Sequence, residues 1–274
     1  MVQEIKHLLL IAEYGTFTAA ARRAHLSQPA LTASIRRLER DIGARLLHRG
    51  RGGAELTAAG HAFVPRARAA LAAIEEGRRA VAEIEGLGAG EVRLGAGATV
   101  CTYLLPKTLA RYRKSFPNVR ISLIEGYRER LEDEVQAGRI DLAIVTGGGD
   151  ELWRRDELII VGAPKLDARR AGFVTFGEGS ATRALLRKHF GEVDIVMELS
   201  GIAAVKSNVR AGIGKALLSR AAVEADVKTG RLVVIGTRNT PIRRKLSLVH
   251  RGVDRLTPSA AALRKMLLAG KKRR

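Results

Sequence analysis

Between Gln28 and Arg37 the chain carries residues of the types that read or hold a nucleic acid. Apolar residues recur there at three- and four-residue spacing, which predicts a helix with one apolar stripe and one polar face. A glutamine can pair with adenine, short hydroxyls can reach bases or phosphates, and arginines position the phosphate backbone. Taken alone, such a face is more often a solvated helix surface. The polar face consists of Gln28, Thr32, Ser34, Arg36 and Arg37.

The residues around this segment predict a helix-turn-helix. Residues 3–14 and 16–24 have the spacing of two short helices, which Gly15 separates. Ser27 can cap the third helix, and Pro29 lies in its first turn, where a missing N–H costs nothing. Two short helices, a tight turn and a capped third helix form this motif. Ser27 and Pro29 are also candidates for DNA contact.

A glycine-rich hairpin is predicted over residues 45–57, as a wing beside the helices. Arg49 and Arg51 lie on it and suit contact with phosphates or with the minor groove. The alternative is that these two arginines are only solubilising charges on a turn. Thr18 and Arg22 can touch phosphate from the helix before the turn.

A long helix is predicted from Thr57 to about Glu85, because no Gly-Pro turn interrupts that stretch. Its apolar seam would lie outside any compact core and therefore needs a partner. A second copy of the chain is the simplest partner, which predicts a homodimer. The seam residues are Phe63, Ala67, Ala70, Ile74, Val81 and Ile84.

The composition excludes several classes of protein. No stretch reaches roughly 18 apolar residues, the length that a membrane span needs. Glu4 and Glu13 flank the apolar patch near the N-terminus, which argues against a signal peptide and for the cytoplasm. The six histidines have no paired ligand spacing, so we expect no metal site and no cofactor. The one cysteine, Cys101, is expected to pack in a core; a redox-sensing thiol is the less favoured alternative.

The net charge of +20 is unevenly distributed along the chain. Residues 1–57 carry nine Lys and Arg against five Asp and Glu, whereas residues 91–274 carry 35 against 19. The larger part of the chain would therefore accept anionic partners. The alternative is that the positive charge only reflects a proteome that favours arginine.

After the glycine-rich residues 86–90, strand and helix patterns alternate, which predicts a mostly parallel sheet covered by helices. GAGATV, residues 95–100, follows a strand and opens a helix. It is only a partial dinucleotide fingerprint, because Val100 takes the place of the third glycine. We favour a site for an anion or polar ligand at the helix N-terminus, where Thr99 can also act as an N-cap.

The segment FTAAARRAHLSQPALTASIRRLERDIGARLLHR and the LTAAG that follows closely resemble the winged helix-turn-helix of LysR-type transcriptional regulators. VRLGAGATVCTYLLPKTLARYRKSFPNVRISLIEG, GRIDLAIV and EGSATR are similar to later parts of the same family. The resemblance covers nearly the whole chain, and its N-terminal part is the more specific.

The resemblance implies an α/β fold with an all-α N-terminal part. A winged helix-turn-helix, a long linker helix and a periplasmic-binding-protein-like (type 2) effector domain of two α/β subdomains would follow one another. The implied boundaries are 1–57 for DNA binding, 58–88 for the linker and dimerisation helix, and 89–268 for the effector domain. Its subdomains would be about 89–163 with 236–268, and about 164–235, before a basic tail at 269–274.

The resemblance also implies a sequence-specific transcriptional regulator, not an enzyme, that responds to a small coinducer bound between the subdomains. Its partners would be double-stranded DNA at an interrupted palindromic operator, further copies in a homodimer or homotetramer, and RNA polymerase, with no membrane. Such a protein is cytoplasmic and nucleoid-associated. An arginine near two helix N-termini makes an anionic coinducer the expectation.

Coinducers of this family contact the loop after the first strand, so Ala98, Thr99 and Cys101 or Thr102 are candidates here. For Arg128 and Arg183 an ordinary salt bridge is an equal alternative. The other residues expected to face the same cleft are Tyr127, Arg128, Thr146, Ser180, Thr182, Arg183, Ser200, Gly201 and Ile202.

The sequence departs from the family at a few places. Only KLDARRAG joins ELIIVGAP to FVTFGEGS, which is shorter than usual and predicts a smaller second subdomain. Ala33 and Ser34 stand where members often have Arg and Gln, which shifts the base preference. Gly97 stands where many have Ser, which removes one hydroxyl donor.

Three other functions fit parts of the sequence. A nucleotide-dependent enzyme would use GAGATV, but GEGSATR lacks the G-x-S-x-G spacing and no paired His–Asp or Cys–His motif appears. A solute-binding transport module would need export. An architectural DNA-binding protein with a degenerate effector domain fits the basic charge and the short connection, and loss of all response to metabolites would favour it.

Overall fold

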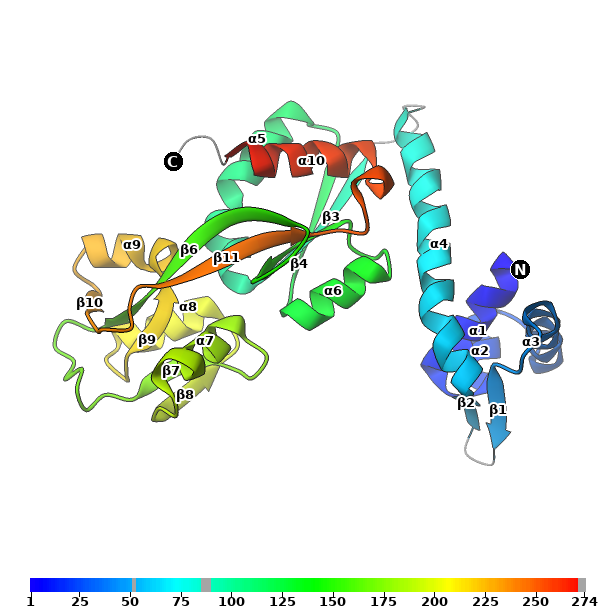
Figure 1. The fold of residues 1–274 in the computed structure, drawn as a ribbon, viewed down its shortest axis with the longest axis horizontal. Helices are drawn as coiled ribbons and strands as arrows, with labels where there is room; N and C mark the ends of the chain where they lie inside the picture. Colours follow the sequence, from blue (N-terminus) through cyan, green and yellow to red (C-terminus); the bar gives the residue numbers. More distant parts are fainter. Residues whose placement is uncertain (51–52, 85–89, 271–274) are drawn as a thin grey trace. The chain divides into compact units, whose positions relative to one another are not determined.

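The fold is that of a computed structural model, which describes residues 1–50, 53–84 and 90–270, with the side chains of 49 and 50 excepted. The chain divides into two compact units, Met1–Arg78 and Arg79–Arg274. The division falls within the long helix α4 (Figure 1). Each unit is described by itself.

The N-terminal unit contains the predicted helix-turn-helix and wing. Thr16 and Ser27 cap the second and third helices, because their hydroxyls accept hydrogen bonds from Ala19 N (3.1 Å) and Ala30 N (3.3 Å). A left-handed glycine, Gly15, ends the first helix. The elements are α1 (Val2–Tyr14), α2 (Phe17–Arg23), α3 (Gln28–Ile42), the antiparallel pair β1 (Leu47–Gly50) and β2 (Gly53–Leu56), and α4 (Ala58–Ile84).

The core of this unit forms where the three short helices pack on one another. The apolar stripe of α3 is buried except at its end, because Ile42 in the last turn is 37% exposed. The small side chains of α2 let the helices approach closely. The most deeply buried residues are Leu8, Ile11, Ala20, Leu31, Ile35, Leu38 and Leu46.

The second unit is built on a seven-stranded sheet with a separate pair, β7 and β8. Its strands are β3 (Glu91–Ala96), β4 (Arg120–Glu125), β5 (Leu142–Thr146), β6 (Glu151–Gly162), β7 (Phe173–Phe176), β8 (Ile195–Leu199), β9 (Ala216–Ser219), β10 (Val233–Ile235) and β11 (Ile242–Val249). Its helices are η1 (Val100–Leu104), α5 (Pro106–Ser115), α6 (Arg128–Gln136), α7 (Ala181–Phe190), α8 (Ile202–Arg210), α9 (Arg220–Lys228), η2 (Val253–Arg255) and α10 (Pro258–Ala269).

The sheet is mixed, which corrects the prediction of a mostly parallel one. The strand order is β10-β6-β11-β5-β3-β4, and β9 also pairs with β6. Among the described residues, only β3 with β4, and β3 with β5, are parallel within it. The pairs that involve β6 or β11 are antiparallel. The alternation of strands and helices does not reveal this direction, because β11 comes from the far end of the chain.

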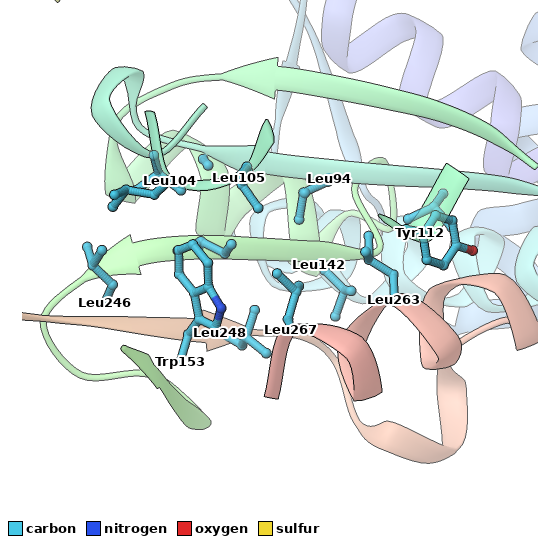
Figure 2. Close-up of a cluster of buried hydrophobic side chains, with 14 of the residues drawn as sticks. Leu94, Leu104, Leu105, Tyr112, Leu142, Trp153, Leu246, Leu248, Leu263 and Leu267 are labelled. Atoms are coloured by element: carbon cyan, nitrogen blue, oxygen red, sulfur yellow. The ribbon is translucent and has the colours of Figure 1, made fainter. Parts of the chain in front are cut away.

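The first lobe consists of β3, β4, β5, η1, α5, α6, η2 and α10. Its strands bury side chains on both faces: α5 and α10 cover one face and α6 the other (Figure 1). Along β5, Leu142 and Ile144 face the first of these cores, and Ala143 and Val145 the second. Figure 2 shows the larger core, where Trp153 lies beside leucines of β11 and α10.

The second lobe consists of β7, β8, β9, β10, α7, α8 and α9. β7 and β8 are parallel, and Phe173 forms an isolated parallel bridge with Lys215, which precedes β9. The long strands β6 and β11 run through both lobes (Figure 1). They lend Trp153 and Leu248 to the core of the first lobe, and Ile159 to that of the second.

The helix expected to open at Thr99 is interrupted. Residues Val100–Leu104 form a π-helix, in which Leu105 N donates to Val100 O (2.9 Å), and α5 begins only at Pro106. Thr99 itself has helical backbone angles and makes no capping hydrogen bond with the described residues, so the prediction of a simple N-cap is wrong. Proline explains the break, because it has no N–H to continue a hydrogen-bonded turn.

Candidate functional site

The polar face of α3 is exposed, as the sequence predicted for a DNA-reading helix. Gln28, Arg36 and Arg37 are exposed and Thr32 is half-buried. Arg37 lies within 3.5 Å of Glu4, so part of its charge is balanced inside the unit. The surface is hollowed along this face. The lining residues are Pro29, Thr32, Ala33, Arg36, Arg37, Glu39, Arg40, Gly43, Ala44 and Arg45.

Two arginines in this hollow, Arg40 and Arg45, were missed as candidates. Arg40 follows Arg36 at helical i, i+4 spacing, which was the available signal. Glu39 has a structural role here, because its Oε1 accepts hydrogen bonds from Leu46 N (2.8 Å) and Leu47 N (3.2 Å). This carboxylate therefore holds the start of the wing against α3.

Ser34 is the residue of this face that the structure places elsewhere. Its side chain is buried and its Oγ lies 2.7 Å from Nδ1 of His7, which comes from α1. The helical stripe and the polar face meet at this position, so spacing alone could not assign it. Ser34 therefore joins α1 to α3 and does not reach a groove.

The remaining predicted DNA contacts are only partly described. Thr18 and Arg22 are exposed on α2, and Ser27 is exposed while it caps α3. Arg49 lies in β1, opposite Ala54 in the hairpin register, but its side chain is not described. Arg51 lies outside the described residues.

We expect the N-terminal unit to lose stability as the pH falls below about 6.5. Burial lowers the pKa of His7 below its ordinary value of 6.5, while Glu4 raises it and Arg37 lowers it. The unfolded chain therefore takes up the proton first, so the stabilisation is complete above pH 6.5 and declines below it. Hydrogen exchange of α1 and α3 peptides, corrected for intrinsic rates at about pH 5.5 and about pH 7.5, measures this. In His7→Gln the loss of protection from exchange between about pH 7.5 and about pH 5.5 should be clearly smaller than in the wild type. An equal loss would show that another group causes the pH dependence.

The second unit contains a cavity of about 280 Å³ lined by both lobes. The loops after β3, β4 and β5 form one side, and the starts of α7 and α8 the other. Arg128 Nη1 donates to Thr146 O (2.9 Å) and its Nη2 lies 2.7 Å from Glu132. The predicted residues that line the cavity are Ala98, Thr99, Tyr127, Arg128, Thr146, Ser180, Thr182 and Ser200.

Arg244 is the most important cavity residue that the sequence analysis missed. It lies in β11, only 7% exposed, and its Nε donates to Asp156 of β6 (2.8 Å). Its Nη1 donates to Thr182 Oγ1 (3.3 Å) at the start of α7. The signal was present, because Ile242 and Leu246 are apolar at alternating positions and place Arg244 on the inward face.

Groups that can hold an anion gather at the cavity, which Glu125 also lines, and both Arg244 and Arg128 are paired with carboxylates. Ser180, Tyr127 and Gly201 are the N-caps of α7, α6 and α8, so three helix N-termini meet around the cavity or directly beside it. Ser180 and Thr99 are each only 8% exposed, and neither hydroxyl makes a capping bond among the described residues. Hydroxyls, free helix N–H groups and the Arg244 guanidinium can together bind a carboxylate or phosphate.

Five predicted residues do not line the cavity. Cys101 packs against the core of the first lobe, its Sγ donates to Ala96 O (3.4 Å), and Thr102 on the π-helix is exposed. Ile202 is buried in the core of the second lobe, and Gly201 is the N-cap of α8. Arg183 forms ion pairs with Glu198 (3.0 Å) and Glu178 (3.3 Å), so for this arginine the salt-bridge alternative is correct.

The environment of Cys101 argues against redox sensing. Burial, together with the nearby charge of Glu125, raises the pKa of the Cys101 thiol to about 11. The thiol therefore stays protonated near neutral pH, whereas reactive cysteines need the thiolate. This agrees with the expectation of a packing residue.

Tyr127 lies against Gly179 in the loop before α7. A Cβ added at Gly179 would lie 3.0 Å from Tyr127 Cδ2, and the glycine has φ +82. We expect Gly179→Ala to lower the free energy of unfolding by more than the roughly 1–2 kcal/mol of left-handed strain alone. Gly212→Ala is the matched control, since Gly212 lies in the same unit, has the same φ of +82 and has open space around it. Urea unfolding of both variants should show the larger loss for Gly179→Ala; equal losses would mean that Tyr127 does not hold this loop.

The described residues lack two features that other functions would need. No cluster of three or more His, Cys, Asp or Glu that could hold a metal ion occurs in residues 1–50, 53–84 and 90–270. Over the same residues, no helix is long and apolar enough to cross a membrane.

Comparisons with known proteins bear on both the helix-turn-helix and the unit that contains the cavity. The family model of the bacterial regulatory helix-turn-helix protein, lysR family, matches residues 2–61, and that of the LysR substrate binding domain matches residues 85–272. A probable RuBisCO transcriptional regulator of Synechocystis sp. is 30% identical and covers 97% of this chain and 85% of its own length. The HTH-type transcriptional regulator CbbR of Sinorhizobium medicae is 30% identical, with 98% and 92% covered.

Solved structures give the same result. The crystal structure of CbnR, a LysR family transcriptional regulator, superimposes with a TM-score of 0.68 at 25% identity and covers 99% of both chains. ArgP of Mycobacterium tuberculosis shares the fold, with a TM-score of 0.71 at 16% identity over 98% of this chain and 97% of its own. The chain therefore belongs to the LysR family of bacterial transcriptional regulators.

Proposed function

We propose that this regulator reads an interrupted palindromic operator with the exposed face of α3. The observation that carries the proposal is the position of Gln28, Thr32 and Arg36 on one capped, solvent-facing helix, in a helix-turn-helix that the family uses on DNA. Gln28 would read adenine and Thr32 a base edge or phosphate, while Arg36 and Arg37 would hold the backbone.

We further propose that an anionic coinducer occupies the cavity between the lobes. Arg244, the hydroxyls of Thr99, Ser180 and Thr182, and the start of α7 would bind its charged group. Apolar neighbours such as Val100, Leu131 and Phe176 would accept a small apolar portion. Residues after the short KLDARRAG connection still line this side of the cavity, at the starts of α7 and α8.

Self-association through α4 is the third part of the proposal. Ile74, Val81 and Ile84 are 41%, 59% and 75% exposed, so the C-terminal part of the predicted seam is available to a second copy. The prediction that the whole seam lies outside a core is wrong, because Ala67 is buried and Phe63 packs against the core of the N-terminal unit. A dimer would place two copies of α3 on two half-sites, and two dimers would form the tetramer. We assign the chain a regulatory and non-enzymatic role in the cytoplasm at the nucleoid, with RNA polymerase as a further partner. We retain 57, 88 and 268 as its domain boundaries.

The first experiment is footprinting of the DNA upstream of the gene, with salt titrated, for the wild type and for Gln28→Ala with Thr32→Ala. The wild type should protect an interrupted palindrome, and the double variant should lose that protection while it retains sequence-independent binding. Because several relatives are named RuBisCO regulators, the DNA upstream of a RuBisCO operon is the second fragment to test. Sequence-blind binding that ignores both substitutions would leave only the architectural function.

A thermal-shift series with carboxylates and phosphates tests the anionic coinducer. We expect an anion that binds to raise the unfolding temperature, as any ligand specific for the folded state does. The same compounds should have little effect on Ser180→Ala with Thr99→Val, and operator protection should change in their presence. If only cationic or neutral compounds shift the wild type, the anionic assignment is wrong.

A further inference from the structure

Apart from Arg244, the function proposed above gives no role to the many basic residues of 91–274, and one exposed cluster of them has an unusual arrangement. β6 and β11 pair antiparallel through the middle of the second unit. In their register Lys245 lies directly opposite Arg155, and Arg243 directly opposite Glu157. Since side chains two residues apart on a strand share a face, these four lie on one face of the pair.

The cations of this cluster exceed its anions. Glu157 lies 3.1 Å from Arg220 Nε and 3.6 Å from Arg243 Nε, so one carboxylate serves two guanidinium groups. Arg155 and Lys245 are both exposed, and no ion pair within the described residues involves either of them. Like charges directly opposite each other destabilise a strand pair. The fold by itself therefore gives no reason for this juxtaposition.

The cluster is separate from the ligand cavity. Arg244 and Asp156, which alternate with these residues along the two strands, are buried, and Arg244 lines the cavity. Strand alternation therefore directs Arg243, Lys245, Arg155 and Glu157 to the opposite, exposed face. A coinducer in the cavity would not reach them.

We propose that this face, called here the ribbon patch and made of Arg155, Lys245, Arg243 and Arg220 around Glu157, binds phosphate groups of the DNA backbone. Four cations beside one carboxylate leave a net positive charge on an exposed surface, and a guanidinium matches the geometry of phosphate. DNA is the polyanion that a protein of this family meets, and the second unit has a large excess of positive charge. The contact is independent of sequence, because only phosphates are held.

The experiment measures binding of the full chain to a non-operator duplex of about 60 base pairs by fluorescence anisotropy, over about 50 to 200 mM salt. The test variant is Arg155→Ala with Lys245→Ala. The matched control is Arg187→Ala with Lys188→Ala, which removes the same two residue types from an exposed stretch of α7. If each removed residue contacts one phosphate, the slope of log affinity against log salt should become shallower by about 1.8 in the test variant and stay unchanged in the control.

Folding of the test variant can be checked with the same samples. Because the substitution removes a like-charge pair, its unfolding temperature should equal or exceed that of the wild type. If the double variant fails to fold, Arg155→Gln alone should still make the slope shallower by about 0.9. Equal slopes for the wild type, test variant and control would overturn the proposal.

A second arm separates DNA from a small phosphate compound. Inorganic phosphate and tripolyphosphate are tested by thermal shift on the wild type and the test variant. A shift that the test variant loses, without any change in its DNA slope, would assign the ribbon patch to a free phosphate compound and overturn the DNA assignment. The non-operator duplex keeps this test apart from operator recognition. If Gln28→Ala with Thr32→Ala fails to affect footprints, the slope result still stands.

Discussion

Asp226→Asn is expected to lower the free energy of unfolding of the second unit by about 3–5 kcal/mol, the cost of leaving a buried charge unpaired. The Asp226 side chain is 1% exposed and lies 2.8 Å from Lys206 Nζ. Lys206 is itself only 8% exposed and also donates to Ala222 O (2.7 Å) and Tyr103 Oη (3.1 Å). The amide would keep the shape of the carboxylate while leaving the ammonium group without its counter-ion.

Urea unfolding of Asp226→Asn beside Asp133→Asn measures this effect. Asp133 is exposed on α6, so its variant controls for loss of an acidic charge. Burial raises the pKa of Asp226, but hydrogen bonds from Arg210 and Lys206 outweigh it and hold that pKa below 3.8. The stabilisation is therefore present above pH 3.8 and lost as the pH falls below it. A loss no greater than that of Asp133→Asn would contradict the assignment of a buried, stabilising carboxylate.

Asp156→Asn is expected to cost more stability than Asp156→Asn together with Arg244→Met. The single change leaves a buried guanidinium unpaired, at a cost of about 3–5 kcal/mol, whereas the double change removes both charges. Arg244 Nη2 lies 2.7 Å from Asp156 Oδ2, and Ser219 Oγ donates to Oδ1 of the same carboxylate (2.8 Å). A double-mutant cycle by urea unfolding gives the coupling between the two residues.

Arg244→Met has a second expected effect, on the ligand cavity. Some anions will raise the unfolding temperature of the wild type. We expect Arg244→Met to weaken their binding by about tenfold or more, since a charged hydrogen bond contributes roughly 1.5–3 kcal/mol. Arg183→Met is the control, because Arg183 is paired with two glutamates and does not line the cavity. If Arg183→Met weakens binding of the anion as much as Arg244→Met does, the charged group of the anion is bound elsewhere.

The N-terminal unit could be predicted closely from the sequence, because its signals are local. Capping by Thr16 and Ser27 and the end at Gly15 each depend on a few neighbouring residues. Ser34 was misplaced, because its buried partner His7 is 27 residues away in the chain. No local pattern indicates a hydrogen bond of that range.

The cavity could be predicted only in outline. The family resemblance indicated Ala98, and the ends of the preceding strands indicated Tyr127 and Thr146, since loops that follow parallel strands meet at one edge of a sheet. Arg244 reaches the cavity from an antiparallel strand 62 residues beyond Thr182, whereas the sequence predicted a mostly parallel sheet. The π-helix turned Cys101 and Thr102 away from the expected loop, and only the proline after it gave any indication.

The path of β11 sets the order in which the molecule can be completed during synthesis. The first lobe begins at β3, yet its sheet needs β11 and its core needs α10, which leave the ribosome only after the whole second lobe. While most of the second unit is synthesised, the nascent chain therefore has one edge of β5 unpaired. The face of the sheet that α10 later covers is also exposed during this time. Such edges and apolar faces are where chains associate wrongly. The N-terminal unit does not depend on later parts of the chain to fold. A truncated product would therefore contain a folded DNA-binding unit attached to an incompletely folded effector domain.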